Sequence, residues 1–289
     1  MAKSRKIVWA ILAVLVGASV LIWMLVWRLD KTRNLEVIFF DVGQGDSIFI
    51  ETPEGFQVLI DGGPDLTILD KLGKEMAFYD RTIDLVVLTH PDHDHIFGLL
   101  EVLKRYQIKN VLWTGVVKDT AEWKEWKGLI EEEGAEIIIA QAGQRIIYSS
   151  DIFFNILFPF ENLEGQEVKD SNNTSVVLKL VFRDKAFLFT GDISQKIEEQ
   201  LTDLNADILK VAHHGSKVST GLEFLQAVSP EIAIISVGEN QWGHPAQETL
   251  KNLEQSGIKV LITKELGDIA FSCRRTLKDS LKCSLSTSL

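Results

Sequence analysis

All six histidines of this chain fall into three short segments, and each segment follows a run of residues with strand character. The first, "HPDHDH", comes directly after the apolar run "LVVLT"; the second, "HH", follows "ILKVA"; the third lies in "GHP". Scattered surface histidines would not follow strand ends three times, so the pattern constrains the fold to bring these strand ends together at one site. Imidazole and carboxylate side chains gathered in this way are typical of metal binding.

The first segment alternates its donors. His90, Asp92 and Asp94 are each two residues apart, and in an extended turn alternate residues point the same way. We therefore expect these three side chains to converge, with Pro91 stiffening the path. His93 occupies an intervening position and is expected to point outward.

The N-terminus carries "IVWAILAVLVGASVLIWMLVW", residues 7–27, without a charge. A helix of this length rises about 30 Å, the thickness of a hydrocarbon core, and Trp9, Trp23 and Trp27 near its ends suit the membrane interfaces. The sequence predicts a basic tail and an uncleaved single-span membrane anchor within residues 1–34, because a cleaved signal peptide has a shorter apolar stretch and a small-residue exit. A buried core helix is the alternative. Cations flank the span on both sides, and the short basic tail favours an extracytoplasmic body.

The charge and the cysteines limit the partners. Residues 1–34 hold six of the 30 basic residues and one of the 41 acidic residues, which leaves 24 basic against 40 acidic side chains in the body. Such a body repels a duplex phosphate backbone unless a local positive centre overrides the field. Cys273 and Cys283 either pair in an exported protein or are two ordinary thiols; the spacing leaves both open.

Beyond the anchor, strand-like and helix-like runs alternate. Three strand-like runs, "EVIFFDV", "DSIFIET" and "FQVLIDGG", read as a meander, and helical and strand patterns then alternate twice through the chain. Two successive halves of this kind predict an α/β protein with two mixed sheets packed face to face and helices outside. No Pro- or Gly-rich linker divides the body, so we expect one domain over residues 35–275 and a C-terminal tail over 276–289.

The motif "THPDHDH" resembles the metal-binding motif of the metallo-β-lactamase superfamily, H-x-H-x-D-H, in the variant H-x-D-x-D-H. The runs "FFDVGQGDSIFIET", "VLIDGG", "FLFTGD", "LKVAHHGS" and "GHP" resemble, in order, the C-terminal hydrolase domain of the ComEC competence (DNA-uptake) family over residues 37–272. The resemblance implies an αββα sandwich, here preceded by one transmembrane helix. It also implies one or two divalent metal ions at the ends of the two sheets, with zinc as the expected metal and manganese as the alternative.

The resemblance further implies a set of metal ligands. His90 and Asp92 would hold a first metal, and Asp94 and His95 a second. Asp192 of "FTGD" would bridge them, although this residue also suits the N-cap of a following helix. His213 of "HHGS" would complete the shell, with His244 as its rival.

The chain departs from the family pattern at the first metal. Asp92 replaces the usual second histidine, and in "DSNNTS" Ser171 stands where the family has a histidine. The first pocket is therefore harder and poorer in ligands, which favours a weaker first metal and leaves occupancy by a single metal open. Asp61-Gly62-Gly63 suits a tight turn beneath the site, and Asp41 and Asp46 are expected to brace the metal loop.

The implied chemistry is hydrolysis. Two cations that share a water would lower its pKa to about 7, so the site would supply hydroxide at neutral pH. Asp94 would act as a catalytic metal ligand, and His214 or His244 would protonate the leaving group, although His214 equally suits a hydrogen-bonded turn. The expected substrate contacts are Asn173, Lys210 and Ser216 for phosphate oxygens and Trp242 for stacking on a base.

Three functions follow from this reading. The leading one is a membrane-anchored, metal-dependent hydrolase, a phosphodiesterase or nuclease acting on single-stranded nucleic acid or nucleotides. The acidic body favours, as an alternative, hydrolysis of a lactone, thioester or β-lactam-like bond. The missing middle histidine motivates a third, a metal-stabilised binding module without turnover. The sequence gives no evidence of a protein partner, and a role in DNA uptake would need a separate channel.

Overall fold

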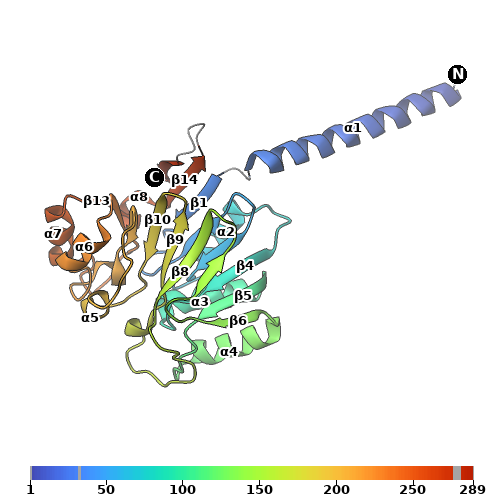
Figure 1. Cartoon of the computed structure of the whole chain (residues 1–289). Coiled ribbons are helices and arrows are strands. Elements are labelled where there is room, and N and C mark those ends of the chain that lie inside the picture. The colour runs from blue at the N-terminus through green and yellow to red at the C-terminus, as the bar shows by residue number, and fades with distance from the viewer. Residues whose placement is uncertain (1, 32–33, 276–280, 289) are drawn as a thin grey trace.

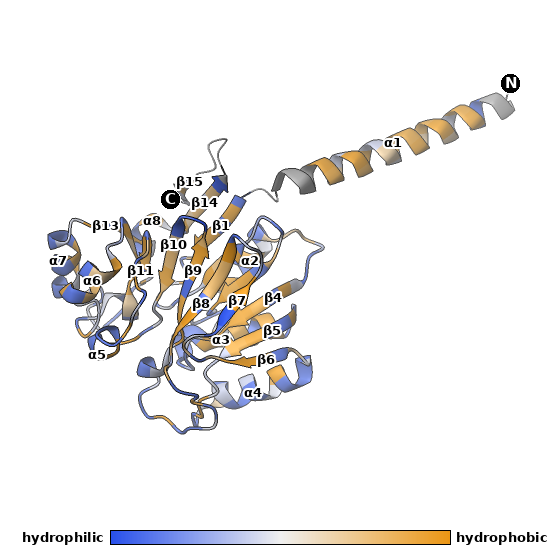
Figure 2. Cartoon of the chain, viewed as in Figure 1, coloured by the Kyte–Doolittle hydropathy of each residue, from blue (hydrophilic) through white to orange (hydrophobic). Residues whose placement is uncertain are grey.

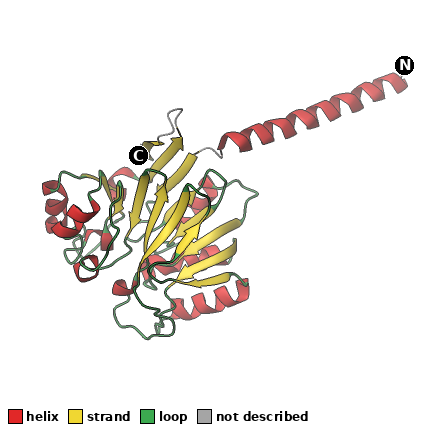
Figure 3. Ribbon diagram, viewed as in Figure 1, coloured by secondary structure: helices red, strands yellow, loops and turns green. Residues whose placement is uncertain are grey.

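Two β-sheets lie face to face with helices on both outer surfaces, as the computed structural model shows for residues 2–31, 34–275 and 281–288 (Figures 1 and 3). Among these residues the first sheet has eight strands. In spatial order they are β15 (Leu281–Thr287), β14 (Ile269–Arg275), β1 (Asn34–Phe39), β2 (Ile48–Glu51), β3 (Gln57–Ile60), β4 (Thr82–Val87), β5 (Gln107–Trp113) and β6 (Glu136–Ile139). The meander predicted for the first three runs is the antiparallel β1–β2–β3.

The second sheet has seven strands in the described part of the chain. In spatial order they are β13 (Lys259–Ile262), β12 (Ile232–Ile235), β11 (Ile208–Lys210), β10 (Lys185–Phe189), β9 (Val177–Phe182), β8 (Ile152–Phe158) and β7 (Arg145–Ile147). Strands β10 to β13 are parallel to one another, whereas β7 to β10 are antiparallel.

The helices cover the outer faces. The first sheet carries α2 (Thr67–Glu75), α3 (His93–Leu103) and α4 (Ala121–Glu133), whose apolar faces pack on β1 to β5. The second sheet carries α5 (Gln195–Glu198), α6 (Leu222–Val228) and α7 (Gln247–Gln255), with α8 (Thr263–Leu266) after β13. Two 3-10 turns, η1 (Asn172–Thr174) and η2 (Ala212–Gly215), complete the order.

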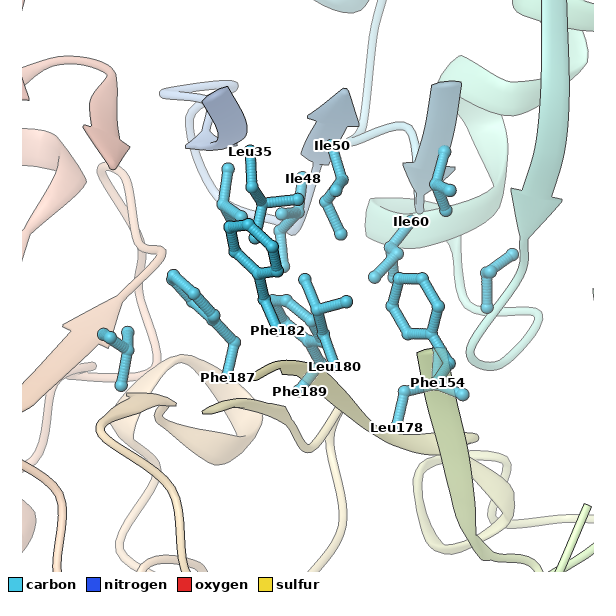
Figure 4. Close-up of a cluster of buried hydrophobic side chains, with 14 of the residues drawn as sticks. Leu35, Ile48, Ile50, Ile60, Phe154, Leu178, Leu180, Phe182, Phe187 and Phe189 are labelled. Atoms are coloured by element: carbon cyan, nitrogen blue, oxygen red, sulfur yellow. The ribbon is translucent and has the colours of Figure 1, made fainter. Parts of the chain in front are cut away.

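The main core lies between the sheets. Figure 4 shows Leu35, Ile50 and Ile60 of the first sheet facing Phe154, Leu180 and Phe189 of the second. These side chains are almost fully removed from solvent, and Phe39 and Phe189 meet across the interface with ring centroids 6.1 Å apart. The predicted αββα sandwich is confirmed.

One edge of the sandwich collects the strand ends that carry the donor residues. Strands β3 and β4 are parallel and end just before Asp61 and His90. Strands β10 and β11 are also parallel and end just before Asp192 and the paired histidines. Because parallel neighbours end at the same edge, segments distant in sequence meet there.

Helix α1 (Ala2–Lys31) projects away from the domain, and its long middle part is apolar (Figures 1 and 2). Residues Arg5–Val26 form the candidate span, with none of it buried, so one N-terminal apolar helix is long enough to cross a membrane. Strand β1 starts at Asn34 and pairs its residue 36 with Glu51, the last residue of β2. The helix therefore joins the sheet at the end opposite the carboxyl ends of β3 and β4.

The C-terminal segment differs from the prediction. A C-terminal tail is predicted over residues 276–289, but Leu281–Thr287 form β15, which pairs with β14 along seven residues. Residues 276–280 and 289 lie outside the described residues. Cys273 and Cys283 stand opposite each other in this pair and form a disulfide. The sequence did not predict β15 because the segment is largely polar, and an edge strand with one solvated face needs few apolar residues.

Candidate metal centre

The motif "HPDHDH" straddles the end of a strand and the start of a helix. Asp92 is the extended residue before α3, and His93 is the first helical residue. The prediction of an extended turn through Asp94 was therefore wrong, because Asp94 and His95 lie in the first helical turn, where a carboxylate also suits the positive helix end. As expected, His93 points outward, with 58% of its side chain exposed, and contacts Glu122.

Helix α3 begins where it does because two glycines let it touch the turn after β3. A Cβ on Gly98 would lie 1.9 Å from the carbonyl oxygen of Gly62. The amide of Gly62 donates to the carbonyl of His95 at 2.8 Å, and that of Gly98 donates to the carbonyl of Gly63 at 3.0 Å. The "DGG" segment is thus the tight turn predicted beneath the site, and it fixes the position of His95.

Four side chains from the two sheets converge at the strand-end edge. Oδ2 of Asp192 lies 3.5 Å from Nε2 of His95 and 3.3 Å from Nε2 of His214. Nε2 of His214 is also 3.2 Å from Oδ2 of Asp94. The donor atoms of Asp94, His95 and His214 lie within 4.8 Å of one another, and so do those of His90, His95 and Asp192. These distances suit nitrogen and oxygen ligands around one ion.

Hydrogen bonds at the far ring nitrogens turn the histidines toward this cluster. Nδ1 of His95 lies 2.8 Å from Oδ2 of Asp61, and Nδ1 of His214 lies 2.8 Å from the carbonyl oxygen of Ser236. Nε2 of His90 and Nε2 of His95 are buried and have no hydrogen-bond partner in the described part of the chain. Buried ring nitrogens without partners, aimed at carboxylates, fit a metal ion, because histidine ligands are oriented through their other nitrogen.

The electrostatics point the same way. Burial alone would lower the pKa of His214, but the charge of Asp192 and hydrogen bonds to Asp192 and Asp94 raise it to about 10. Burial likewise opposes protonation of His95, yet Asp192, Asp61 and Asp94 hold its pKa well above the usual range. Protons on the imidazoles thus balance a surplus of carboxylate charge, and a divalent cation would displace them.

Lys210 lies beneath this cluster and not in the pocket. Its side chain is 1% exposed, its ammonium forms an ion pair with Asp46, and Nζ is 3.4 Å from Oδ1 of Asp192. The prediction that Lys210 contacts a substrate phosphate was therefore wrong. Asp46 does brace the loop, since its backbone carbonyl also accepts from Gly63 at 2.9 Å. Asp41 acts locally, accepting from the amide of Gly43 at 3.3 Å.

His214, and not His213, is the inner histidine of "HHGS". Nε2 of His213 is 3.9 Å from Oδ2 of Asp192, and the ring faces Asn172 and His244. The placement of His213 in the metal shell is corrected accordingly. Both histidines have left-handed backbones, with φ of 51° and 52°, which turn the chain so that the second ring points inward. Each costs roughly 1–2 kcal/mol, and such strain is concentrated at functional sites.

Two further predicted substrate contacts have structural roles. Ser216 is buried, and its carbonyl accepts from Thr249 at 2.9 Å. Oδ1 of Asn173 accepts from the hydroxyl of Ser194 at 2.7 Å, ahead of α5. Neither residue lines the pocket over the cluster, so both assignments are corrected.

A pocket of about 470 Å³ opens above the donor cluster. Its lining residues are Gln44, Asp92, His93, Asp94, Asn172, Asp192, His213, His214, Trp242 and His244. Trp242 is 64% exposed and stacks on His244 with ring centroids 6.4 Å apart, and His244 meets His213 at 5.5 Å. These three rings form one wall of the pocket, which leads from solvent to the carboxylates.

Sequence reasoning missed Lys118. Its ammonium contacts Oδ1 of Asp92 and lies 2.8 Å from the hydroxyl of Ser171, which also donates to Asp92. The other oxygen of Asp92 is 3.8 Å from Nε2 of His90. Lys118 sits in the loop after β5, outside every motif, and no pattern in the sequence pointed to it.

Comparison with known proteins agrees with this geometry. The family model described as the metallo-beta-lactamase superfamily matches residues 40–239. ComE operon protein 3 of Bacillus subtilis (strain 168) is 34% identical, covering 82% of this chain and 33% of that protein. Competence protein ComA of Neisseria gonorrhoeae is 32% identical, covering 83% of this chain and 32% of that protein. The chain thus spans about a third of the length of these relatives.

Among solved structures, the metallo-beta-lactamase fold protein YhfI of Bacillus subtilis superposes with a TM-score of 0.58 at 13% identity. The match covers 83% of this chain and 100% of YhfI. At this identity the similarity establishes a shared fold.

Proposed function

This chain belongs to the metallo-beta-lactamase superfamily, and we propose that it is a metal-dependent hydrolase that cleaves phosphodiester bonds in single-stranded nucleic acid or nucleotides. The observation that carries the proposal is the position of Asp192. Its buried carboxylate lies between the imidazoles of His95 and His214 at the floor of an open pocket.

Some residues of the site would bind the metal ion, and others orient the residues that bind it. Asp94, His95, Asp192 and His214 would hold a divalent ion, which when bound polarises the scissile bond and lowers the pKa of a water. Asp61 and the carbonyl of Ser236 keep the imidazoles in the orientation that presents Nε2.

We assign proton transfer to His244. Both ring nitrogens of His214 are engaged, one by Ser236 and one by the carboxylates, so this residue is not free to exchange a proton with substrate. His244 lines the pocket and its Nδ1 has no hydrogen-bond partner among the described residues. Burial, followed by the charges of His213 and His214, lowers the pKa of His244, so the ring is neutral at pH 7 and free to accept a proton, although it is a weaker base than an exposed imidazole.

The pocket wall favours nucleotides. Trp242, His244 and His213 present aromatic faces beside the metal donors, and stacking of a base on such a ring is worth about 1–3 kcal/mol. The name of the Neisseria gonorrhoeae relative refers to competence, which supports a nucleic-acid substrate. Because the body is acidic, the metal must supply most of the attraction, and binding should be modest and sensitive to salt.

We propose that the domain lies outside the cytoplasm and is held to the membrane by α1. The disulfide between Cys273 and Cys283 supports this location, because disulfides persist in oxidising compartments. The metal centre lies at the end of the sandwich away from α1, so the pocket would face away from the bilayer.

The test uses the full chain in lipid nanodiscs with Mn²⁺ or Zn²⁺. Single-stranded DNA, bis(p-nitrophenyl) phosphate, a chromogenic lactam and a lactone are compared as substrates. We expect turnover of the two phosphodiesters, its loss in Asp192→Asn, and its retention in Asp119→Asn, whose carboxylate is 91% exposed. Faster turnover of the lactam or lactone would move the assignment to the alternative hydrolase. Metal binding without any turnover would leave a binding module.

A further inference from the structure

Lys118 forms a partly buried ion pair at the side of the metal centre where His90 and Asp92 lie. Its ammonium contacts one oxygen of Asp92 and the hydroxyl of Ser171, and its side chain is 24% exposed. This is the position at which the sequence pattern places a first metal ion. The ammonium of Lys118 contacts Oδ1 of Asp92, the ligand expected for that ion, while Oδ2 of the same carboxylate faces His90.

The backbone holds Lys118 in place. Val117 pairs with Glu167 in a parallel bridge, and the amide of Val117 donates to the carbonyl of Gln166 at 2.8 Å. The amide of Val168 returns a hydrogen bond to the carbonyl of Val117 at 3.2 Å. The same two segments deliver Lys118 and Ser171, so their contact with Asp92 is part of the loop architecture and not the position of a free surface lysine.

The two sides of the centre differ in charge. Asp94 and Asp192 face the imidazoles of His95 and His214, and their donors lie close enough to surround one ion. The described residues that line the pocket include no lysine, and Lys210 contacts Asp192 from beneath. On the other side the donor atoms of His90, His95 and Asp192 lie within 4.8 Å of one another. Asp92, whose Oδ2 is 3.8 Å from Nε2 of His90, has its charge balanced by Lys118. Ser171 points its hydroxyl at Asp92 and adds no strong ligand. A second dication there would share Asp192 and His95 with the first ion, and the one further carboxylate, Asp92, is already balanced by an ammonium of like charge to the metal.

We propose that Lys118 takes the electrostatic place of the first metal, so that the protein binds a single divalent ion at Asp94, His95, Asp192 and His214. Lys118 is a positioning residue that acts through Asp92. The inference rests on the proposed metal-dependent function, but its test measures bound metal and does not depend on turnover.

The experiment titrates the full chain in detergent with Mn²⁺ and records the electron paramagnetic resonance spectrum, with metal content measured after dialysis. The wild-type protein should hold one ion per chain with an uncoupled six-line signal. In the double variant Lys118→Met with Ser171→His, Asp92 is released and an imidazole is added beside it. This variant should hold two ions with a spin-coupled signal.

The control is Lys124→Met, which removes an exposed lysine on the neighbouring helix and should leave one ion. Asp92→Asn in the otherwise wild-type chain provides a second measurement if the double variant does not fold. Because Asp92 is not a ligand of the single ion, manganese affinity should change less than threefold, whereas loss of the ion would overturn the proposal. Two ions in the wild-type protein would also overturn it. Failure of the wild-type chain to bind any metal would refute the proposed function as well.

Discussion

The substitution Asp61→Asn tests how the orientation of His95 affects metal binding while His95 itself is retained. Oδ1 of Asp61 accepts from the amide of Thr89 at 2.8 Å, and Oδ2 faces the hydroxyl of Thr89 at 2.6 Å and Nδ1 of His95 at 2.8 Å. The amide of Thr89 is a fixed donor. An asparagine must therefore place its oxygen at Oδ1 and its NH₂ group at Oδ2.

That NH₂ group would donate to Nδ1 of His95 and so force the ring proton onto Nε2, the nitrogen that faces Asp192. A protonated Nε2 cannot bind metal, so the ring must change tautomer at the expense of a buried hydrogen bond. Loss of such an outer partner lowers metal affinity by about 10- to 100-fold, or roughly 1.4–2.8 kcal/mol.

The assay is competition for Zn²⁺ with a chromophoric chelator, using the full chain in detergent. Asp80→Asn is the matched control, because Asp80 accepts hydrogen bonds from Gln57 and Thr82 at the other end of the sheet. It should alter thermal stability at most and leave zinc affinity unchanged. If Asp61→Asn binds Zn²⁺ within twofold of the wild type while folded, His95 is not held by Asp61 for metal binding.

Three further predictions follow. His214→Ala should weaken Zn²⁺ binding by at least 100-fold while His213→Ala changes it less than fivefold, because His214 is the inner histidine; equal losses in the chelator assay would contradict this placement. Metal affinity should rise with pH, because Asp192 and Asp94 stabilise a proton on His214, with pKa about 10, and this proton must leave before Nε2 binds the metal. A titration between pH 6 and 9 should show the association constant rising by up to about tenfold per pH unit, with release of a proton. A metal affinity that does not change with pH would contradict the protonation of His214 in the metal-free protein. Gly98→Ala should lower the free energy of unfolding by about 1–3 kcal/mol, because its Cβ would overlap the carbonyl of Gly62, whereas Gly128→Ala in α4, where a Cβ meets nothing within 4 Å, should be neutral or stabilising in thermal melts.

The sequence determined the architecture and the set of candidate donors. Apolar runs of strand length between helical patterns encode the two sheets, since each face must be buried on one side. The order of strands and turns placed His90, Asp94, His95 and Asp192 at strand ends. One local feature was also predicted from residue types alone, the tight turn at Asp61-Gly62-Gly63 beneath the site.

Tertiary structure decided which of these residues face one another. Adjacent histidines are equivalent in sequence, and only the left-handed turn at residues 213 and 214 chose the inner one. Lys210 is the last residue of β11 and is buried under the site, whereas Lys118 reaches Asp92 because a backbone bridge between two loops holds it there. The direction of a side chain depends on backbone dihedrals and on contacts between segments far apart in the chain, such as those of Lys210 with Asp46 and of His214 with Asp94. A one-dimensional pattern records residue types and spacing, and those contacts exist only after the two sheets have packed.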